Sequence, residues 1–352
     1  SAGTSTDNSE WTVYDQNYFG KLGFHLSPYS GPVYYVSTSG LDGYNGSAEY
    51  PFATIQTAID SSSDGDTVLV VAGTYVETIN MIQKCNLLIT SELLLYPDST
   101  ELIDSTIIKS QSRVYGSDAY CTFNGFTFNP ETEGNFGIAP FGFFANYPNC
   151  GPVLEIKNSY VSGYSLGENG FFQEYGAHIK INNVSFSDNT IISNNSGWLI
   201  EEVGSSMVNI SFINNTGGYV NGGPSQGGLK NSIFYGNTDV VINTDYIYYS
   251  LVEGQANEAN NVISGNPLFC NPDSGDFTLA ENSPCIGTGE NGVNMGAFGV
   301  GCGPLILAPV ILDIAFDQQI YEDDSLTLVF SATSDINASM SFTATSDTSD
   351  VS

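Results

Sequence analysis

A pattern around asparagine is repeated along the middle of the chain and limits its possible folds more than any other feature. It occurs four times between Lys157 and Thr238, with the asparagines 25, 26 and 22 residues apart. A period of this length is typical of solenoids, in which each repeat forms one coil of a stack. The four asparagines are Asn158, Asn183, Asn209 and Asn231.

Apolar residues on both sides of each asparagine predict a bend there. Ile156 lies two positions before Asn158 and Val161 three positions after it, and the other repeats follow suit. Because side chains of a straight strand alternate with a period of two, these positions share a face only if the backbone bends. Asparagine tolerates the left-handed conformation that such a bend needs. The sequence therefore predicts an all-β parallel β-helix with an asparagine ladder, and a β-sandwich with asparagine-rich turns is the alternative.

The repeat resembles the right-handed parallel β-helix (solenoid) superfamily of pectate-lyase-like proteins, in which an asparagine ladder of this kind is known. A second stretch, 33–82, resembles the N-terminal cap of many secreted β-helix proteins. It reads as a strand, a short amphipathic helix at about 52–60 that follows Pro51, and a buried strand. Such a helix would cover the open end of the coil stack. The resemblance implies a fold and export, and it implies no particular reaction.

Three parts are expected along the chain. Residues 1–32 form an N-terminal arm or cap extension, and 33–303 form the right-handed parallel β-helix. Residues 304–352 resemble the start of a cadherin-like or immunoglobulin-like β-sandwich, which needs about 100 residues, so this C-terminal sandwich is partial. Residues 266–299 resemble the terminal segment of secreted bacterial β-helix proteins. We therefore expect a secreted, extracellular or cell-surface protein.

Acidic residues outnumber basic ones by 38 to 7, which gives a formal net charge of −31. This charge argues against nucleic acid as a partner. No apolar run reaches the roughly 20 residues of a membrane-spanning helix, so membrane insertion is not expected. Ca²⁺ is the one cofactor that the acidic loops suggest. Its candidate ligands are Asp42, Asn45, Asp273 and Asp276, for which turn formation is the alternative account.

Six cysteines in a polar chain fit an oxidising compartment. Cys270 and Cys285 flank one short acidic segment and are the first expected disulfide. Cys121 with Cys150 is the second. Cys85 and Cys302 then remain as free thiols. Sequence alone does not fix the connectivity.

Aromatic residues interrupt the repeat twice between 129 and 176. Loops that project from consecutive coils would be neighbours, so these rings are candidates for a glycan-binding surface. Packing on the coil exterior or on another subunit is the alternative. The candidates are Phe136, Phe141, Phe143, Phe144, Tyr147, Tyr164, Phe171, Phe172 and Tyr175.

Catalytic residues are hard to find in the repeat. Glycosidases need two carboxylic acids at a set separation, and no column of the repeat that we compared pairs two acids. A polysaccharide lyase needs a base, and Lys180 beside His178 is the one basic pair. Lys157 and Lys230 share a register but are three coils, or about 14 Å, apart. Lys180, His178 and Asp188 are the candidate catalytic residues, with a solvated strand residue as the other account of Lys180.

The sequence favours a non-catalytic structural or adhesive β-helix protein, for example a self-assembling fibre subunit. Its expected partners are copies of itself, bound head-to-tail or by strand donation, or an extracellular glycan. A polysaccharide lyase or glycoside hydrolase on an acidic polysaccharide is the first alternative. A glycan-binding module that uses the aromatic loops at 129–176 is the second.

Overall fold

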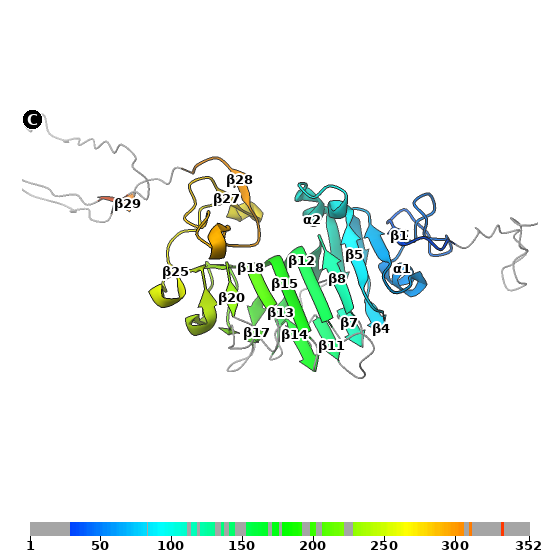
Figure 1. Ribbon diagram of the computed structural model, residues 1–352, viewed down its shortest axis with the longest axis horizontal. Helices are drawn as coiled ribbons and strands as arrows, with labels where there is room; N and C mark the ends of the chain where they lie inside the picture. The colour runs from blue at the N-terminus through cyan, green and yellow to red at the C-terminus, as the bar shows by residue number, and fades with distance from the viewer. Residues whose placement is uncertain are drawn as a thin grey trace, which may run out of the picture.

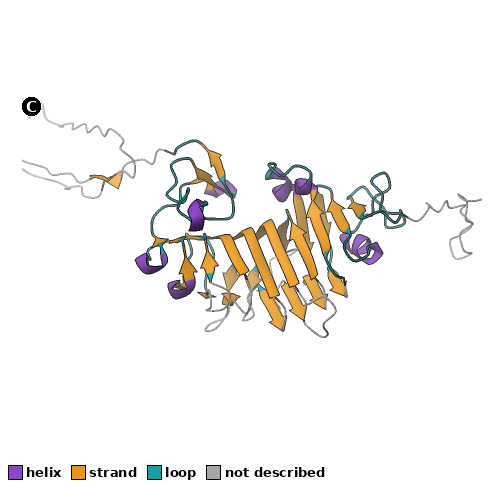
Figure 2. Ribbon diagram, in the orientation of Figure 1, coloured by secondary structure: helices purple, strands orange, loops and turns teal. Residues whose placement is uncertain are grey.

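A computed structural model of the chain confirms a parallel β-helix, in which the strands of successive coils lie side by side (Figures 1 and 2). The predictions for an N-terminal arm at 1–32 and for a partial sandwich at 304–352 fall mostly outside the residues that the structure describes. Those residues are 29–82, 84–110, 114–117, 120–130, 135–136, 141–144, 153–167, 171–175, 178–191, 198–201, 206–221, 228–305, 310–311 and 332–333.

The largest sheet has 15 strands, and each of its strand pairs is parallel. Its main path runs through β1 (Val33–Val36), β2 (Thr67–Val70), β5 (Leu87–Ser91), β8 (Tyr120–Asn124), β12 (Val153–Ser162), β15 (His178–Ser187), β18 (Ser206–Ile213), β21 (Ile233–Tyr235), β24 (Ser250–Val252) and β25 (Val262–Ile263). Its other strands are β3 (Gly73–Val76), β6 (Thr106–Ser110), β9 (Thr127–Pro130), β20 (Leu229–Lys230) and β23 (Ile247–Tyr248).

Three smaller parallel sheets complete the coils. They are β10 (Asn135–Phe136) with β13 (Ser165–Leu166) and β16 (Thr190–Ile191); β4 (Asn80–Ile82) with β7 (Val114–Ser117), β11 (Phe141–Phe144) and β14 (Phe172–Tyr175); and β17 (Trp198–Glu201) with β19 (Tyr219–Asn221) and β22 (Val241–Asn243). The segments predicted as aromatic insertions therefore form strands of the coils. A further antiparallel pair joins β29 (Val310–Ile311) to β30 (Ala332–Thr333).

The predicted bend occurs at every repeat. The four ladder asparagines have φ between 48° and 56°, and Gly125 takes the same role one coil earlier with φ of 83°. The residues on either side point inward as expected: Ile156, Val161 and their counterparts are at most 2% exposed. The phenylalanine column is stacked, with ring centroids 5.2 Å apart for Phe186 and Phe212 and 5.0 Å apart for Phe212 and Phe234.

The N-terminal cap has the expected helix, α1 (Ile55–Ser61), which begins three residues later than predicted. The preceding Phe52 is extended, because it forms a parallel bridge with Val36. The helix therefore begins only after its N-cap, Thr54. Ile55, Ala58 and Ile59 are buried and close the end of the apolar interior. The spacing of the apolar residues therefore predicted this helix correctly.

The segment 266–302 does not continue the coils. It folds back over the outside of the stack as β26 (Phe269–Asn271), β27 (Asp276–Ala280) and β28 (Val300–Cys302), with β26 and β27 antiparallel. Its apolar residues form a second core with outward residues of the coils, and Phe298 lies 4.7 Å from the ring of Tyr160. We call 266–302 the C-terminal segment.

Short helices occupy several loops outside the sheets. The α-helix α2 (Glu101–Ser105) and the 3-10 helix η1 (Glu92–Leu94) rise on the same side of the stack as the C-terminal segment (Figure 1). The remaining 3-10 helices are η3 (Thr244–Tyr246), η4 (Glu258–Asn260), η5 (Pro272–Ser274) and η6 (Glu290–Gly292). In the described part of the chain no helix has the length and apolar character needed to cross a membrane.

The disulfide predictions were wrong. Cys270 is bonded to Cys302, with their Cα atoms 5.9 Å apart, because the C-terminal segment brings its first and last strands together. Cys285 and Cys121 are free and buried in the two apolar cores. Cys85, expected to be free, is disulfide-bonded. The other predicted partner, Cys150, lies outside the described residues.

Candidate functional site

The outward face of β8, β12 and β15 carries the most distinctive group of polar side chains. Before the bend at Asn158 the residues of β12 alternate, so Leu154 and Ile156 face the core while Glu155 and Lys157 face outward. The parallel register places Glu155 beside Thr122 on one side and beside Lys180 on the other. The three strands lie side by side along the stack (Figure 1). We call the outward side chains of Tyr120, Thr122, Glu155, Lys157, Lys180 and Asn182 the lysine face.

Two contacts hold groups of the lysine face in place. Thr122 Oγ1 donates a hydrogen bond of 2.9 Å to Glu155 Oε2, which fixes that carboxylate. Lys180 Nζ lies 5.8 Å from the centre of the Tyr120 ring, within the range of a cation–π contact. Neither contact neutralises the charge of Lys180. The face therefore combines a carboxylate, an aromatic ring and ammonium groups.

Lys157 and Lys180 stand close together, and neither forms an ion pair among the described residues, although Glu155 lies opposite Lys180 in the register. They lie on neighbouring strands, two residues out of register, which places their Cα atoms about 7–8 Å apart. Within the described part of the chain, the one ion pair joins Lys230 to Glu290 and involves neither of them. In a chain of charge −31, such a pair of ammonium groups creates a local site for an anion.

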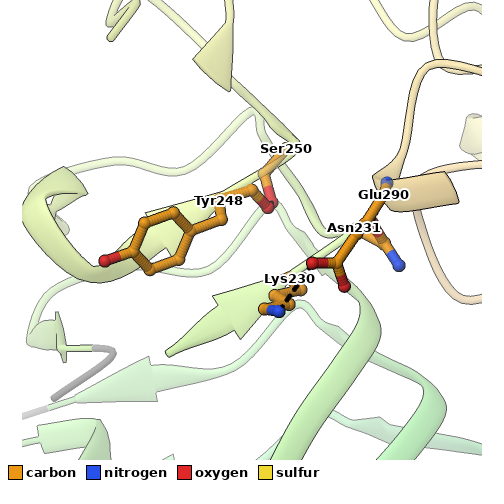
Figure 3. A network of polar contacts seen from close by, with 5 residues as sticks. All are labelled: Lys230, Asn231, Tyr248, Ser250 and Glu290. Atoms are coloured by element: carbon orange, nitrogen blue, oxygen red, sulfur yellow. Dashed lines mark hydrogen bonds and ion pairs between the residues drawn. The ribbon is translucent and has the colours of Figure 1, made fainter. Parts of the chain in front are cut away.

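Lys230 belongs to the same sheet but is engaged elsewhere. Its Nζ lies 2.8 Å from Glu290 Oε1 of the C-terminal segment, and the backbone N–H of Glu290 donates to Asn231 Oδ1 at 2.7 Å. Figure 3 shows this network together with Tyr248 and Ser250, whose hydroxyl donates to the Tyr248 carbonyl. The C-terminal segment thus contacts the sheet that carries the lysine face, at the interior strand β20.

The predicted catalytic residues are only partly brought together. Lys180 is exposed on the lysine face. His178 lies in the same strand, in register with Val153, but its side chain lies outside the described residues. Asp188 lies beyond the bend at Asn183, in the closing turn of the coil, where it takes a left-handed conformation with φ of 56°. Asp188 therefore serves a turn and is not a neighbour of Lys180.

The aromatic surface predicted at 129–176 is wrong for the three rings that the structure describes. Phe141, Tyr164 and Phe171 are 1%, 3% and 0% exposed and belong to the main core. They are inaccessible because their segments are strands or turns of the coils, with these side chains directed inward. Tyr147 and the side chains of the other five candidates lie outside the described residues; they are Phe136, Phe143, Phe144, Phe172 and Tyr175.

The candidate calcium ligands all lie in turns. Asp42 Oδ1 accepts hydrogen bonds from the N–H groups of Ala53 and Thr54 ahead of α1. Asn45 and Asp276 each accept a bond from a backbone N–H two residues later, and Asp273 lies in the first turn of η5. No group of three or more acidic, histidine or cysteine residues that could hold a metal is present among the described residues. Calcium binding stays a prediction.

A pair of acids that the repeat does not reveal lies on another face. Asp104 at the end of α2 and Asp276 in β27 both act on the Tyr160 hydroxyl, whose pKa is raised by burial and then by these two carboxylates. Burial also raises the pKa of Asp104, and the nearby Asp276 adds to the rise. The two residues are far apart in sequence, so only the folding back of the C-terminal segment brings them together.

Comparisons with known proteins give low structural similarity and leave the activity open. No family model and no curated protein matches the chain. Among solved structures, the chain is similar to pectate lyase Pel9A, with 12% identity, a TM-score of 0.31, and coverage of 78% of this chain and 98% of that one. It is also similar to a rhamnogalacturonan lyase, with 14% identity, a TM-score of 0.27, and coverage of 63% and 68%.

Proposed function

We propose that the lysine face binds an acidic polysaccharide, such as a polymer of uronate sugars. The observation that carries this proposal is the pair of ammonium groups on Lys157 and Lys180, which form no ion pair in the described part of a strongly acidic chain. Most of the surface repels a polyanion, so binding is favoured where cations stand together. Glu155, held by Thr122, would accept hydrogen bonds from sugar hydroxyls.

Binding is tested by titrating the full chain with polygalacturonate at low salt in a calorimeter. Lys157→Gln and Lys180→Gln should each weaken binding about five-fold, and the double substitution more than ten-fold. Lys109→Gln is the matched control, because it removes the same charge from β6, outside the lysine face. Equal losses of affinity in the three single variants would mean that only net charge matters and would refute this face as the site.

Cleavage of the bound polymer by β-elimination is a second candidate function, favoured by the exposure of Lys180 next to Lys157. Lys157 would neutralise the uronate carboxylate, and Lys180 would take the proton from the neighbouring carbon. The electron pair of that carbon–hydrogen bond forms a carbon–carbon double bond as the bond to the glycosidic oxygen breaks, and this oxygen leaves with a proton from water.

The products distinguish cleavage mechanisms. β-Elimination yields unsaturated ends, seen by ultraviolet absorbance, and Lys180→Ala should abolish them. Hydrolysis yields reducing ends without unsaturation and would direct attention to Asp104 with its neighbour Asp276, since the raised pKa of Asp104 suits a general acid. In that case Asp104→Asn should remove activity while Lys180→Ala should not. Absence of both products, with binding retained, limits the function to recognition.

An extracellular location also belongs to this proposal. The Cys270–Cys302 disulfide is supported by the structure, and disulfides persist mainly in oxidising compartments. Self-assembly through residues 1–32 and 304–352 stays a separate prediction, because these ends lie mostly outside the described residues. A monodisperse monomer in light scattering at high protein concentration, with Ca²⁺ present, would argue against it.

A further inference from the structure

Lys230 lies in the same outward row of the sheet as Lys157. The register connects Lys157 to Asn182, Asn182 to Val208 and Val208 to Lys230. The Lys230 ammonium is nevertheless paired with Glu290, and the two side chains are 29% and 34% exposed. An ion pair this accessible to water contributes little stability, so another carboxylate can replace Glu290.

The turn that carries Glu290 interrupts the asparagine ladder. Along the preceding coils each side-chain amide donates to the oxygen of the previous rung, as Asn209 Nδ2 does to Asn183 Oδ1 at 3.0 Å. The register places Asn231 next to Asn209, yet Asn209 Oδ1 is buried with no hydrogen-bond partner among the described residues. Asn231 Oδ1 instead accepts the backbone N–H of Glu290. A buried acceptor is thus left unsatisfied while the turn is in place, which is unfavourable.

The turn itself is tight and lies directly against the sheet. A Cβ added at Gly289 would lie 2.9 Å from Asn231 Oδ1, and Asn291 has a left-handed backbone with φ of 61°. The N–H of Gly296 anchors the following residues to the Asn231 carbonyl at 2.7 Å. The contacts of residues 289–292 with Lys230 and Asn231 are polar and few, while the apolar anchoring of the segment lies further along the chain.

We propose that Lys230 is a third anion-binding position of the lysine face and that Glu290 occludes it. This inference rests on the proposed binding of an acidic polysaccharide. A carboxylate of the bound polymer takes the place of Glu290 at Lys230, and the turn 289–292 moves off the sheet. The Asn231 side chain, released from the Glu290 N–H, can then rotate so that its Nδ2 donates to Asn209 Oδ1, which completes the ladder. Lys230 lies about 12 Å from Lys180 across the sheet, so one polymer chain reaches both.

The test compares polygalacturonate binding by Glu290→Gln with that of the full wild-type chain. Glu290→Gln should bind about three- to ten-fold more tightly, because Lys230 no longer needs to be released. Glu258→Gln in η4 is the control, since it makes the same change of net charge away from the face. Adding Lys230→Gln to Glu290→Gln should remove the gain, because the polymer then loses its contact with Lys230.

Hydrogen exchange supplies a readout that does not depend on affinity. Saturation with the polymer should speed exchange of the Glu290 amide, and unchanged exchange would overturn the proposal. Equal affinities of Glu290→Gln and Glu258→Gln, with binding still dependent on Lys157 and Lys180, would refute the occlusion and leave the proposed function intact. Absence of binding by every variant would refute both.

Discussion

Three of the four repeats carry asparagine at two corners of the coil, and the two sets are bonded differently. At the bend, Asn158, Asn183 and Asn209 take left-handed backbones and donate only to the side chains of neighbouring coils. At the closing turn, Asn189 and Asn215 are fully buried, and their amides also bond backbone groups. We refer to these as the bend ladder and the turn ladder. The bend ladder selects a backbone conformation, whereas the turn ladder satisfies buried peptide groups.

The bonds of Asn215 show how much the turn ladder connects. Its Nδ2 donates to the Phe186 carbonyl at 2.9 Å and to Asn237 Oδ1 at 3.1 Å. Its Oδ1 accepts from both the backbone and the side-chain N–H groups of Asn189. One side chain therefore links three coils. The bend does not require asparagine, by contrast: one coil has Gly125 at this position and keeps the left-handed backbone.

The largest effect is expected from Asn215→Ala. It leaves the Phe186 carbonyl and the Asn189 backbone N–H without these partners in a buried site, which should cost about 3 kcal/mol of unfolding free energy. Urea unfolding measures the loss. Asn182→Ala is the control, because that exposed side chain accepts one bond from Asn209 at 3.2 Å, and it should change stability by less than about 0.5 kcal/mol. Similar losses of unfolding free energy in both variants would mean that burial of the asparagine does not determine its contribution to stability.

The bend ladder should show a smaller loss that separates into two causes. Asn183→Gly keeps the left-handed conformation and removes the amide bonds to Asn158 and Asn209, at a cost of about 1 kcal/mol. Asn183→Ala adds the steric cost of a side chain at φ of 56°, about 1 kcal/mol more. The difference between the two variants, measured by the same urea unfolding, isolates the conformational part. Equal stability of the two would mean that the bend does not select for residue type.

The repeat predicted the bend ladder because its rule is local. A phase shift between apolar positions requires a bend, and asparagine or glycine permits one, so Asn158 and Gly125 were both interpretable without knowledge of neighbours. The turn ladder appears in the sequence as repeated Asn–Thr pairs, but its energetic role depends on which carbonyl of an adjacent coil lies within reach. The pairing of Cys270 with Cys302 was unpredictable for a related reason: the C-terminal segment turns back.

The lysine face includes the positions three residues before Asn158 and Asn183, which are Glu155 and Lys180. The sequence shows this face only when these positions are compared with that of Lys157, one residue before the asparagine. The reason is that Lys157 and Lys180 are diagonal neighbours on adjacent strands. The Asp104–Asp276 pair has no such signal, since α2 and β27 belong to different parts of the chain. Sequence periodicity thus predicts what repeats and is silent about contacts between the coils and the C-terminal segment.

A substitution in the last coils is expected to increase stability. Tyr249 occupies the bend position after Asn231 and has φ of 50°, which is unfavourable for a residue with a large side chain. Tyr249→Asn should stabilise the protein by up to about 1 kcal/mol relative to Tyr249→Ala, which removes the ring without relieving the backbone. Thermal unfolding of the two variants gives the comparison. If they unfold at the same temperature, the left-handed bend carries no cost at this end of the stack.

The smallest expected effect is on the pH dependence of stability. The N-terminal cap should contribute to this dependence, and the two ladders should not. Neither ladder contains a titratable group, so the loss caused by Asn215→Ala should be equal near pH 5 and near pH 8. In the cap, burial raises the pKa of Glu77 above its ordinary value of 4.5, opposed by hydrogen bonds from the Ile55 and Gln56 N–H groups.

An acid whose pKa is raised on folding binds its proton more tightly in the native state. Its stabilising contribution is therefore complete below about pH 4.5 and is lost as pH rises through the native pKa. Glu77→Gln should remove this part of the pH dependence, and the difference from wild type is measured by urea unfolding across the range. A slope of opposite sign would mean that the two N–H bonds at the start of α1 outweigh burial. The carboxylate would then resemble the turn ladder, in which hydrogen bonds to backbone groups make a buried polar side chain favourable.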